Sequence, residues 1–120
     1  MKYLCLVYID EKKLNALSNS EMETLVADAL AYDDVLRNSG HYIVSDALQS
    51  VQTATTVRNR NGKVSITDGP FAETKEQLGG FILIKAKDLN DALHVAAKIP
   101  PGRIGSIEVR PVADLTQPVA

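Results

Sequence analysis

Ionisable side chains cluster around one turn of the chain: Asp68 stands before Gly69 and Pro70, and Glu73 and Lys75 follow within seven residues. A carboxylate that a turn directs into a cleft is partly desolvated, which raises its pKa and suits it to abstract protons near neutral pH. Asp68 is therefore the candidate catalytic base, with Glu73 and Lys75 as further catalytic candidates. In the alternative, Asp68 only caps the turn by accepting hydrogen bonds from its own downstream amides.

Arg58, Phe71 and Glu76 are the candidate substrate-binding residues beside this turn. Lys75 can hold a substrate carboxylate while Glu73 or Glu76 moves a proton, and Arg58 can clamp a carboxylate with two parallel hydrogen bonds. We expect Phe71 to anchor the loop as a plug in the core or in an interface. The alternative for the charged residues is a solvated loop whose surface ion pairs contribute about 0–1 kcal/mol each.

Neither a metal nor a cofactor is expected from the remaining residues. His41 and His94 lie more than fifty residues apart without a third ligand in a recognisable pattern. We expect His94 to be solvated, and His41 to lie at the surface or, alternatively, to face the cleft beside Asp46. Cys5, in an apolar segment, is expected to behave as a small hydrophobic residue.

Composition excludes several classes of protein. The chain has 120 residues, about one domain, with 13 Lys and Arg against 15 Asp and Glu, so the formal net charge is −2. It has no basic surface for nucleic acid and no apolar run near the roughly 20 residues that span a bilayer. A single cysteine cannot form an intrachain disulfide. We therefore expect a cytoplasmic protein that binds neither nucleic acid nor membranes.

The elements that must position these residues follow the order β–α–β–(β)β–β–α–β. Ser20 and Glu23 fit a capping box that opens a helix over residues 20–39. Asn61 and Gly62 predict a tight hairpin turn, because both central positions of a type I′ turn need positive φ. Asp88 is expected to cap a second helix. The predicted buried stripes are Met22, Leu25, Val26, Ala29, Leu30 and Leu36 in the first helix and Leu89, Ala92, Leu93, Ala96 and Ala97 in the second.

The strands predicted over residues 3–9 and 81–86 are apolar on both faces. Two helices can cover only one face of the sheet, and exposed apolar patches of that size are rare on monomers. The sequence therefore predicts an α+β fold that forms a homodimer through the other face of its sheet.

The run DGPFAETKEQLGGF, residues 68–81, resembles the signature of the DGPF-domain proteins, a branch of the YciI-like (YCII-related) superfamily. TATTVR at 53–58 and IEVRPV at 107–112 extend the resemblance over nearly the whole chain. It implies a ferredoxin-like antiparallel sheet with two helices on one face, paired into a dimeric α/β barrel. The domain would span residues 1–113, followed by a C-terminal tail over 114–120.

The resemblance implies no single reaction. It associates many members with extracytoplasmic-function sigma factors, and one relative is a chloromuconolactone-type dehalogenase with a suspected histidine–aspartate pair. No histidine of this chain lies in the first half of its first predicted helix, where that histidine is expected. Two hypotheses follow: a cofactor-free acid/base enzyme (lyase, isomerase or hydrolase) acting on a small anionic metabolite, and a non-catalytic module that binds a ligand or a protein such as a sigma factor.

Overall fold

A computed structural model of the chain describes residues 1–116, which form one four-stranded sheet, one separate hairpin and three α-helices. The strands are β1 (Lys2–Ile9), β2 (Tyr42–Ala47), β3 (Thr55–Arg60), β4 (Lys63–Asp68), β5 (Gln77–Lys85) and β6 (Gly105–Pro111). The helices are α1 (Glu11–Asn15), α2 (Asn19–Asn38) and α3 (Leu89–Ala97), with short 3₁₀ turns η1 (Val51–Thr53) and η2 (Pro100–Ile104).

The four-stranded sheet has the order β2-β5-β1-β6, and every neighbouring pair is antiparallel. The predicted α+β class with an antiparallel sheet is confirmed. The short helix α1 was not predicted: it begins where the carboxylate of Asp10 accepts a hydrogen bond from the backbone N–H of Lys12. The sequence predicted only that the first strand ends at Ile9, directly before these charged residues.

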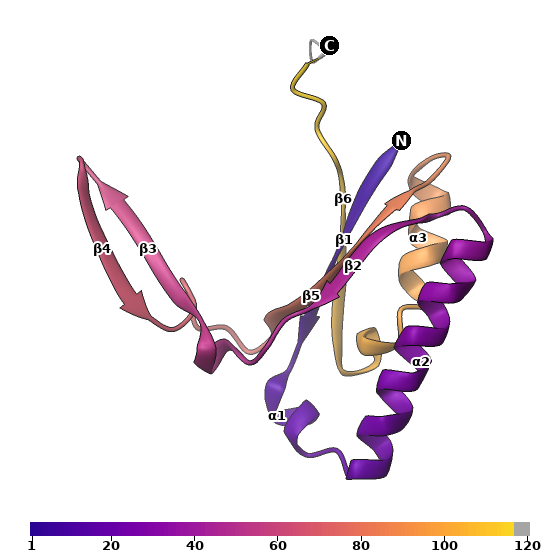
Figure 1. Ribbon diagram of the computed structural model, residues 1–120, viewed down its shortest axis with the longest axis horizontal. Helices are drawn as coiled ribbons and strands as arrows, with labels where there is room; N and C mark the ends of the chain where they lie inside the picture. The colour runs from indigo at the N-terminus through magenta and orange to yellow at the C-terminus, as the bar shows by residue number, and fades with distance from the viewer. Residues whose placement is uncertain (117–120) are drawn as a thin grey trace.

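The core lies between the sheet and the helices α2 and α3, which lie on the same side of the sheet (Figure 1). Alternate residues of β1, Tyr3, Cys5 and Val7, are buried in this core. The hydroxyl of Tyr32 on α2 donates a 2.7 Å hydrogen bond to the carbonyl of Val95 on α3, which ties the two helices together. Burial raises the pKa of this phenol above its usual value.

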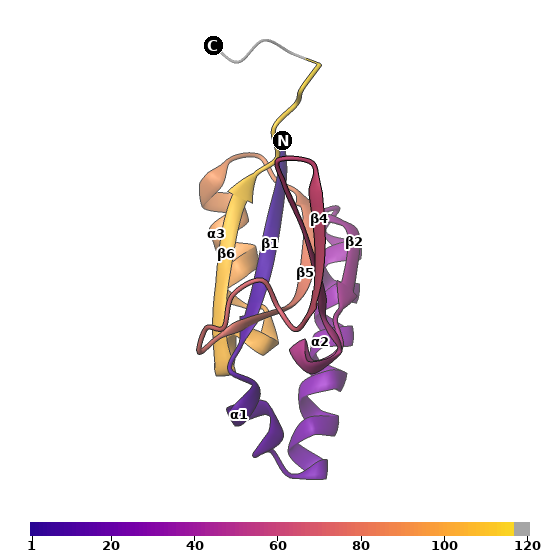
Figure 2. The same ribbon diagram turned by 90° about the vertical axis from the view of Figure 1, so that its left-hand side faces the viewer.

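The opposite face of the sheet is only partly covered. Leu4 and Leu6 of β1 lie opposite Leu83 and Phe81 of β5, and all four side chains are half-buried. We call this surface, together with Val44 of β2, the open face of the sheet. Helices α2 and α3 lie behind the sheet in Figure 2, and the β3–β4 hairpin lies in front of it.

The predicted start of the long helix is wrong by two residues. Ser18 is the N-cap: its hydroxyl accepts a hydrogen bond from the N–H of Glu21, and the carboxylate of Glu21 accepts one from the N–H of Ser18. Ser18 and Glu21 have the same spacing as the predicted pair Ser20 and Glu23, so the sequence contains two overlapping capping-box patterns.

The predicted buried stripes of both helices are also partly wrong. Val26 and Leu30 are 50% and 62% exposed, and in α3 Leu89 and Leu93 are 49% and 45% exposed. Within α2 only Leu36 is fully buried. The buried stripes are therefore narrower than predicted. In α2 the apolar side chains that are partly or fully buried are Met22, Leu25, Ala29, Tyr32 and Leu36, and in α3 the buried ones are Ala92, Val95 and Ala96.

The expected tail over 114–120 lies partly outside the described residues, which end at 116. Within the described part, the carboxylate of Asp114 accepts hydrogen bonds from the backbone N–H and the hydroxyl of Thr116. These bonds lower the pKa of Asp114. Over residues 1–116, none of the helices is both long and apolar enough to cross a membrane.

Candidate functional site

The turn that carries Asp68 is held by two hydrogen bonds to the start of the hairpin, at Ala54 and Thr56. Asp68 ends β4, and Gly69 adopts a φ of 101°, which glycine tolerates better than other residues. The N–H of Gly69 donates to the carbonyl of Ala54, and its carbonyl accepts from the hydroxyl of Thr56, both over 2.7 Å. The turn is therefore fixed to the base of the hairpin.

Arg58 braces the loop that follows this turn. Its guanidinium donates one 3.0 Å hydrogen bond to the hydroxyl of Thr67 and another to the carbonyl of Phe71. The ring of Phe71 is 80% exposed, so the expectation that it plugs the core of the protomer is wrong. The binding of a substrate by Arg58 and Phe71, and a place for Phe71 in an interface, stay predictions.

The rest of the loop is braced in the same way. The side-chain amide of Gln77 donates to the carbonyls of Ala72 and Thr74, and the hydroxyl of Thr74 donates to the carbonyl of Glu76. The carboxylate of Glu76 accepts a 2.7 Å hydrogen bond from the hydroxyl of Ser106 on β6. Glu76 therefore links the loop to the edge of the main sheet.

Asp68, Glu73 and Lys75 are exposed, and their side chains make no hydrogen bond or ion pair within residues 1–116. None of the three lines the hollow beside α3 and β6 or the one at the end of α2. The structure thus places the predicted catalytic residues on a braced, solvent-facing loop. Their catalytic roles stay predictions.

A second cluster of polar side chains forms where α2 ends. Gly40 follows the helix with a φ of 81°, and the N–H of His41 donates to the carbonyl of Leu36. This tight turn brings the hydroxyl of Ser39 to 2.6 Å from Nδ1 of His41. The same hydroxyl lies 3.2 Å from the carbonyl of Leu36, which is its second acceptor.

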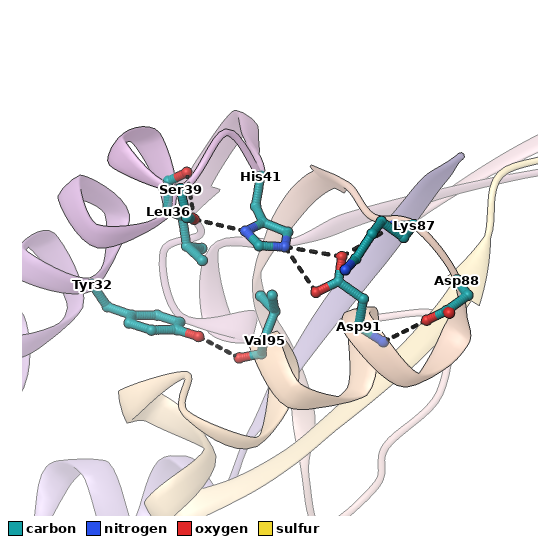
Figure 3. Close-up of polar contacts among 8 residues, drawn as sticks. All are labelled: Tyr32, Leu36, Ser39, His41, Lys87, Asp88, Asp91 and Val95. Carbon is teal, nitrogen blue, oxygen red and sulfur yellow. Dashed lines mark hydrogen bonds and ion pairs between the residues drawn. The ribbon is translucent and has the colours of Figure 1, made fainter.

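His41 also contacts a carboxylate fifty residues further along the chain (Figure 3). Its Nε2 lies 3.0 and 3.1 Å from the two carboxylate oxygens of Asp91, in the first turn of α3. Asp88 caps that helix, as predicted, and accepts a hydrogen bond from the N–H of Asp91. Ser39, His41 and Asp91 therefore form one continuous hydrogen-bonded chain.

The protonation of this chain follows from its donors and acceptors. The backbone N–H of Lys87 and then the imidazole of His41 donate to Asp91 and lower the pKa of its carboxyl group. The ionised carboxylate can only accept, so Nε2 of His41 carries a proton. In the neutral imidazole Nδ1 then holds a lone pair, which accepts from the hydroxyl of Ser39 or from a ligand.

The three residues line an open hollow of about 430 Å³. Its wall also contains Lys85 and Lys87, whose exposed side chains form no ion pair within the described residues. The two lysines supply two positive charges against the single carboxylate of Asp91 in this wall. The hollow therefore combines a general base or acid with cationic groups that can hold an anion.

A larger hollow of about 670 Å³ lies between α3, η2 and β6. Its wall is part aliphatic, with Leu93, Ile107 and Val109, and part polar. Its cations are Lys98 and Arg103, and Arg103 pairs with Asp28 over 2.9 Å. It has no carboxylate or imidazole in its wall, so the smaller hollow is the better candidate for acid/base chemistry.

The pair of His41 and Asp91 was not predicted from the sequence. His41 was expected at the surface or beside Asp46, but Asp46 lies opposite Phe81 on the open face of the sheet. The capping residue Asp88 was visible in the sequence, and Asp91 follows it at the N3 position of the same helix. Nothing in the spacing of His41 and Asp91 indicates their contact, because only the pairing of β2 with β5 brings them together.

Charged side chains also pair outside the two hollows. Glu108 and Arg110, two residues apart on β6, form an ion pair along that strand. Within residues 1–116 no group of three or more His, Cys, Asp or Glu side chains could hold a metal ion.

Comparison with known proteins shows which family the chain resembles. Residues 1–116 match the family model of the YCII-related domain. The chain is also 38% identical over 115 residues to an uncharacterized protein of Rhizobium meliloti (strain 1021), an alignment that covers 94% of this chain and 93% of the relative.

Proposed function

The chain belongs to the family of YCII-related domains, and we propose that this member is a cofactor-free acid/base enzyme acting on a small anionic metabolite. The observation that carries the proposal is the hydrogen-bonded chain of Ser39, His41 and Asp91 in a hollow that also contains two lysines. In this proposal His41 accepts and returns the proton, and Asp91 orients the imidazole and stabilises its charged form.

The proton path runs through Nδ1 of His41. When the hydroxyl of Ser39 turns to its other acceptor, the carbonyl of Leu36, the lone pair of Nδ1 is free to receive a proton from a substrate C–H or O–H. The imidazolium that forms is stabilised by the carboxylate of Asp91, 3.0 Å from Nε2. Returning the proton to another carbon of the substrate completes an isomerisation. Giving it to a departing oxygen as the bond of that oxygen to carbon breaks completes an elimination, and neither reaction needs a cofactor.

The substrate class follows from the charge and size of the hollow. A volume of about 430 Å³ lies at the lower end of the range for small-molecule sites. Lys85 and Lys87 supply point charges that suit a carboxylate or phosphate group. A small carboxylic acid with an acidic C–H therefore fits the site best.

Deuterium exchange tests this proposal. The protein is incubated in D₂O with a panel of small oxo acids, unsaturated carboxylic acids and lactones, and loss of substrate C–H signals is followed by proton NMR. We expect protein-dependent exchange with at least one compound. His41→Asn should slow this exchange about 10²- to 10⁴-fold, the usual contribution of a positioned acid or base.

His94→Asn is the matched control, because His94 is the other histidine and lies exposed on α3. It should leave the exchange rate unchanged. Lys85→Gln should weaken the apparent affinity for the anion more than it changes the maximal rate. Equal rates for the wild type and His41→Asn, with every active compound, would contradict the proposal.

A second candidate function is a binding module, and the braced loop over residues 68–77 favours it. Its backbone is fixed by Arg58 and Gln77, while Asp68, Glu73 and Lys75 present unpaired charges to solvent. A rigid loop of this kind suits recognition of a ligand or of a protein such as a sigma factor. Affinity capture with Asp68→Asn as the comparison tests it: a stoichiometric partner lost in the variant would support the module.

We also propose that the fold is ferredoxin-like and that two copies pair through the open face of the sheet into a dimeric α/β barrel. The order β2-β5-β1-β6, with a long helix after β1 and another after β5, supports the first part. The half-buried Leu4, Leu6 and Phe81 support the second. Light scattering should give twice the monomer mass at micromolar concentration, and a monomer would contradict the pairing.

A further inference from the structure

The β3–β4 hairpin, residues 55–68, extends from the body of the protein as an arm (Figures 1 and 2). Its two strands pair with each other and form a sheet separate from the main one. The radius of gyration is 16.4 Å, against about 13–14 Å for a compact chain of this length. The arm contributes to this excess.

One face of the arm is apolar. Val57 lies opposite Ile66, and Val64 follows on the same face opposite Asn59. Val57, Val64 and Ile66 are 63%, 61% and 68% exposed. The other face carries polar and basic side chains, namely Thr56, Arg58, Arg60, Lys63, Ser65 and Thr67.

An arm of this kind needs a partner surface. An isolated two-stranded hairpin is marginally stable in water, and three adjacent aliphatic side chains on one face gain stability only when they are covered. The same chain presents a second apolar surface that is only partly covered, the open face of its sheet, on the side from which the arm projects (Figure 1).

The area that a stable dimer needs favours a second copy as the occupant of both surfaces. Four strands about 20 Å long and about 4.8 Å apart give the open face a footprint of roughly 400 Å². A standard interface buries about 800 Å² on each partner, so the sheet alone falls short. The arm adds a footprint of roughly 200 Å², and the surface that receives the arm of the second copy adds roughly 200 Å² more, so each protomer contributes roughly 800 Å².

We propose that the arm of each protomer packs its apolar face, Val57, Val64 and Ile66, against the second copy and clamps the dimer. This inference rests on the sheet-to-sheet pairing proposed above and assigns the arm as a second part of that interface. The basic face of the arm remains in solvent. Each protomer gives one arm and receives one, as a two-fold axis requires.

Sedimentation velocity on two matched double variants tests the arm. Val64→Gln with Ile66→Gln removes two apolar side chains from one face of β4, and Lys63→Gln with Ser65→Gln changes two positions on the other face of the same strand. We expect the wild type to be dimeric at micromolar concentration. The first variant should raise the dimer dissociation constant at least about 100-fold, and the second less than about threefold.

Each outcome separates the two proposals. A monomeric wild type would overturn both the pairing and the arm. A dimeric wild type with both variants unchanged, or with both weakened equally, would overturn the arm alone and leave the pairing through the sheet. Because Val64 and Ile66 are exposed in the protomer, both variants should fold, and circular dichroism checks this.

Discussion

Nε2 of His41 lies 3.0 Å from one carboxylate oxygen of Asp91 and 3.1 Å from the other. This contact joins the start of β2 to the first turn of α3 and places a histidine–carboxylate pair at the edge of a hollow. Asp91 orients the imidazole through Nε2. The hydroxyl of Ser39 near Nδ1 has a second acceptor in the carbonyl of Leu36, so it can turn away and leave Nδ1 open to a substrate.

The first prediction concerns the dependence of stability on pH. The pKa of Asp91 is lowered by the N–H of Lys87 and by His41, so the folded state favours the carboxylate. A group with a lowered pKa adds stability above its unfolded pKa, and this stability is lost as the pH falls through the folded pKa. Asp91→Asn should therefore have a lower Tm than the wild type near pH 6, and the difference should shrink below about pH 4.

Thermal unfolding at pH 3 to 7 measures this difference. His94→Asn, in the same helix but exposed, should follow the wild type over that range. A difference between Asp91→Asn and the wild type that grows toward pH 3 would show that the carboxylate does not stabilise the fold.

The second prediction tests the narrow packed stripe of α2. Leu36 is 2% exposed and Leu30 is 62% exposed, although both belong to the stripe predicted from sequence. Leu36→Ala should lower the free energy of unfolding by about 2–5 kcal/mol, and Leu30→Ala by less than about 1 kcal/mol. Equal losses in urea denaturation would mean that the helix is rotated relative to the sheet.

The third prediction concerns two adjacent glycines of β5. A Cβ added at Gly80 would lie 2.9 Å from the carbonyl oxygen of Asp46, which is backbone of the neighbouring strand. A Cβ at Gly79 would meet only the side chain of Ile9, 2.8 Å from its terminal methyl group. Gly80→Ala should cost about 1–3 kcal/mol, more than Gly79→Ala, because a side-chain end can move and a paired strand cannot.

Denaturation of both glycine variants gives the comparison, and amide exchange of β2 locates the damage. A larger loss for Gly79→Ala than for Gly80→Ala would contradict the close approach of β2 and β5.

The fourth prediction concerns the thiol of Cys5. The side chain is fully buried, and burial raises its pKa from 9.0 to about 11. Two pH units reduce the thiolate fraction about 100-fold, so labelling with a disulfide reagent at pH 8 should be at least about 100-fold slower than in the unfolded chain. Because the folded pKa is raised, stability should also fall between pH 9 and 11. Fast labelling of the folded protein would contradict the burial of β1.

Local chemistry made much of the fold predictable. Asn61 and Gly62 have φ values of 53° and 81°, as a type I′ turn requires, and the hairpin forms where the sequence indicated. Asp88 caps the second helix for an equally local reason, since its side chain reaches the N–H of Asp91. Such features depend on residues within four positions of one another.

Features that depend on long-range packing were not predictable. The contact of His41 with Asp91 depends on the register of β2 against β5, which no local pattern encodes. Phe71 looks like a core residue by type but lies exposed, because its loop is held through its carbonyl and not through its ring. Whether Asp68 faces a partner depends on the assembly, so its role remains a prediction.

The most direct test of the account is an NMR titration of the ¹⁵N-labelled protein with small carboxylates and phosphates. If His41 and Asp91 form a ligand site, shift changes should be confined to residues 39–41 and 85–91, and His41→Asn should abolish them. Shift changes confined to residues 68–77 would contradict this site and support the braced loop instead. No shift changes with any compound at millimolar concentration would contradict an acid/base enzyme for small anions.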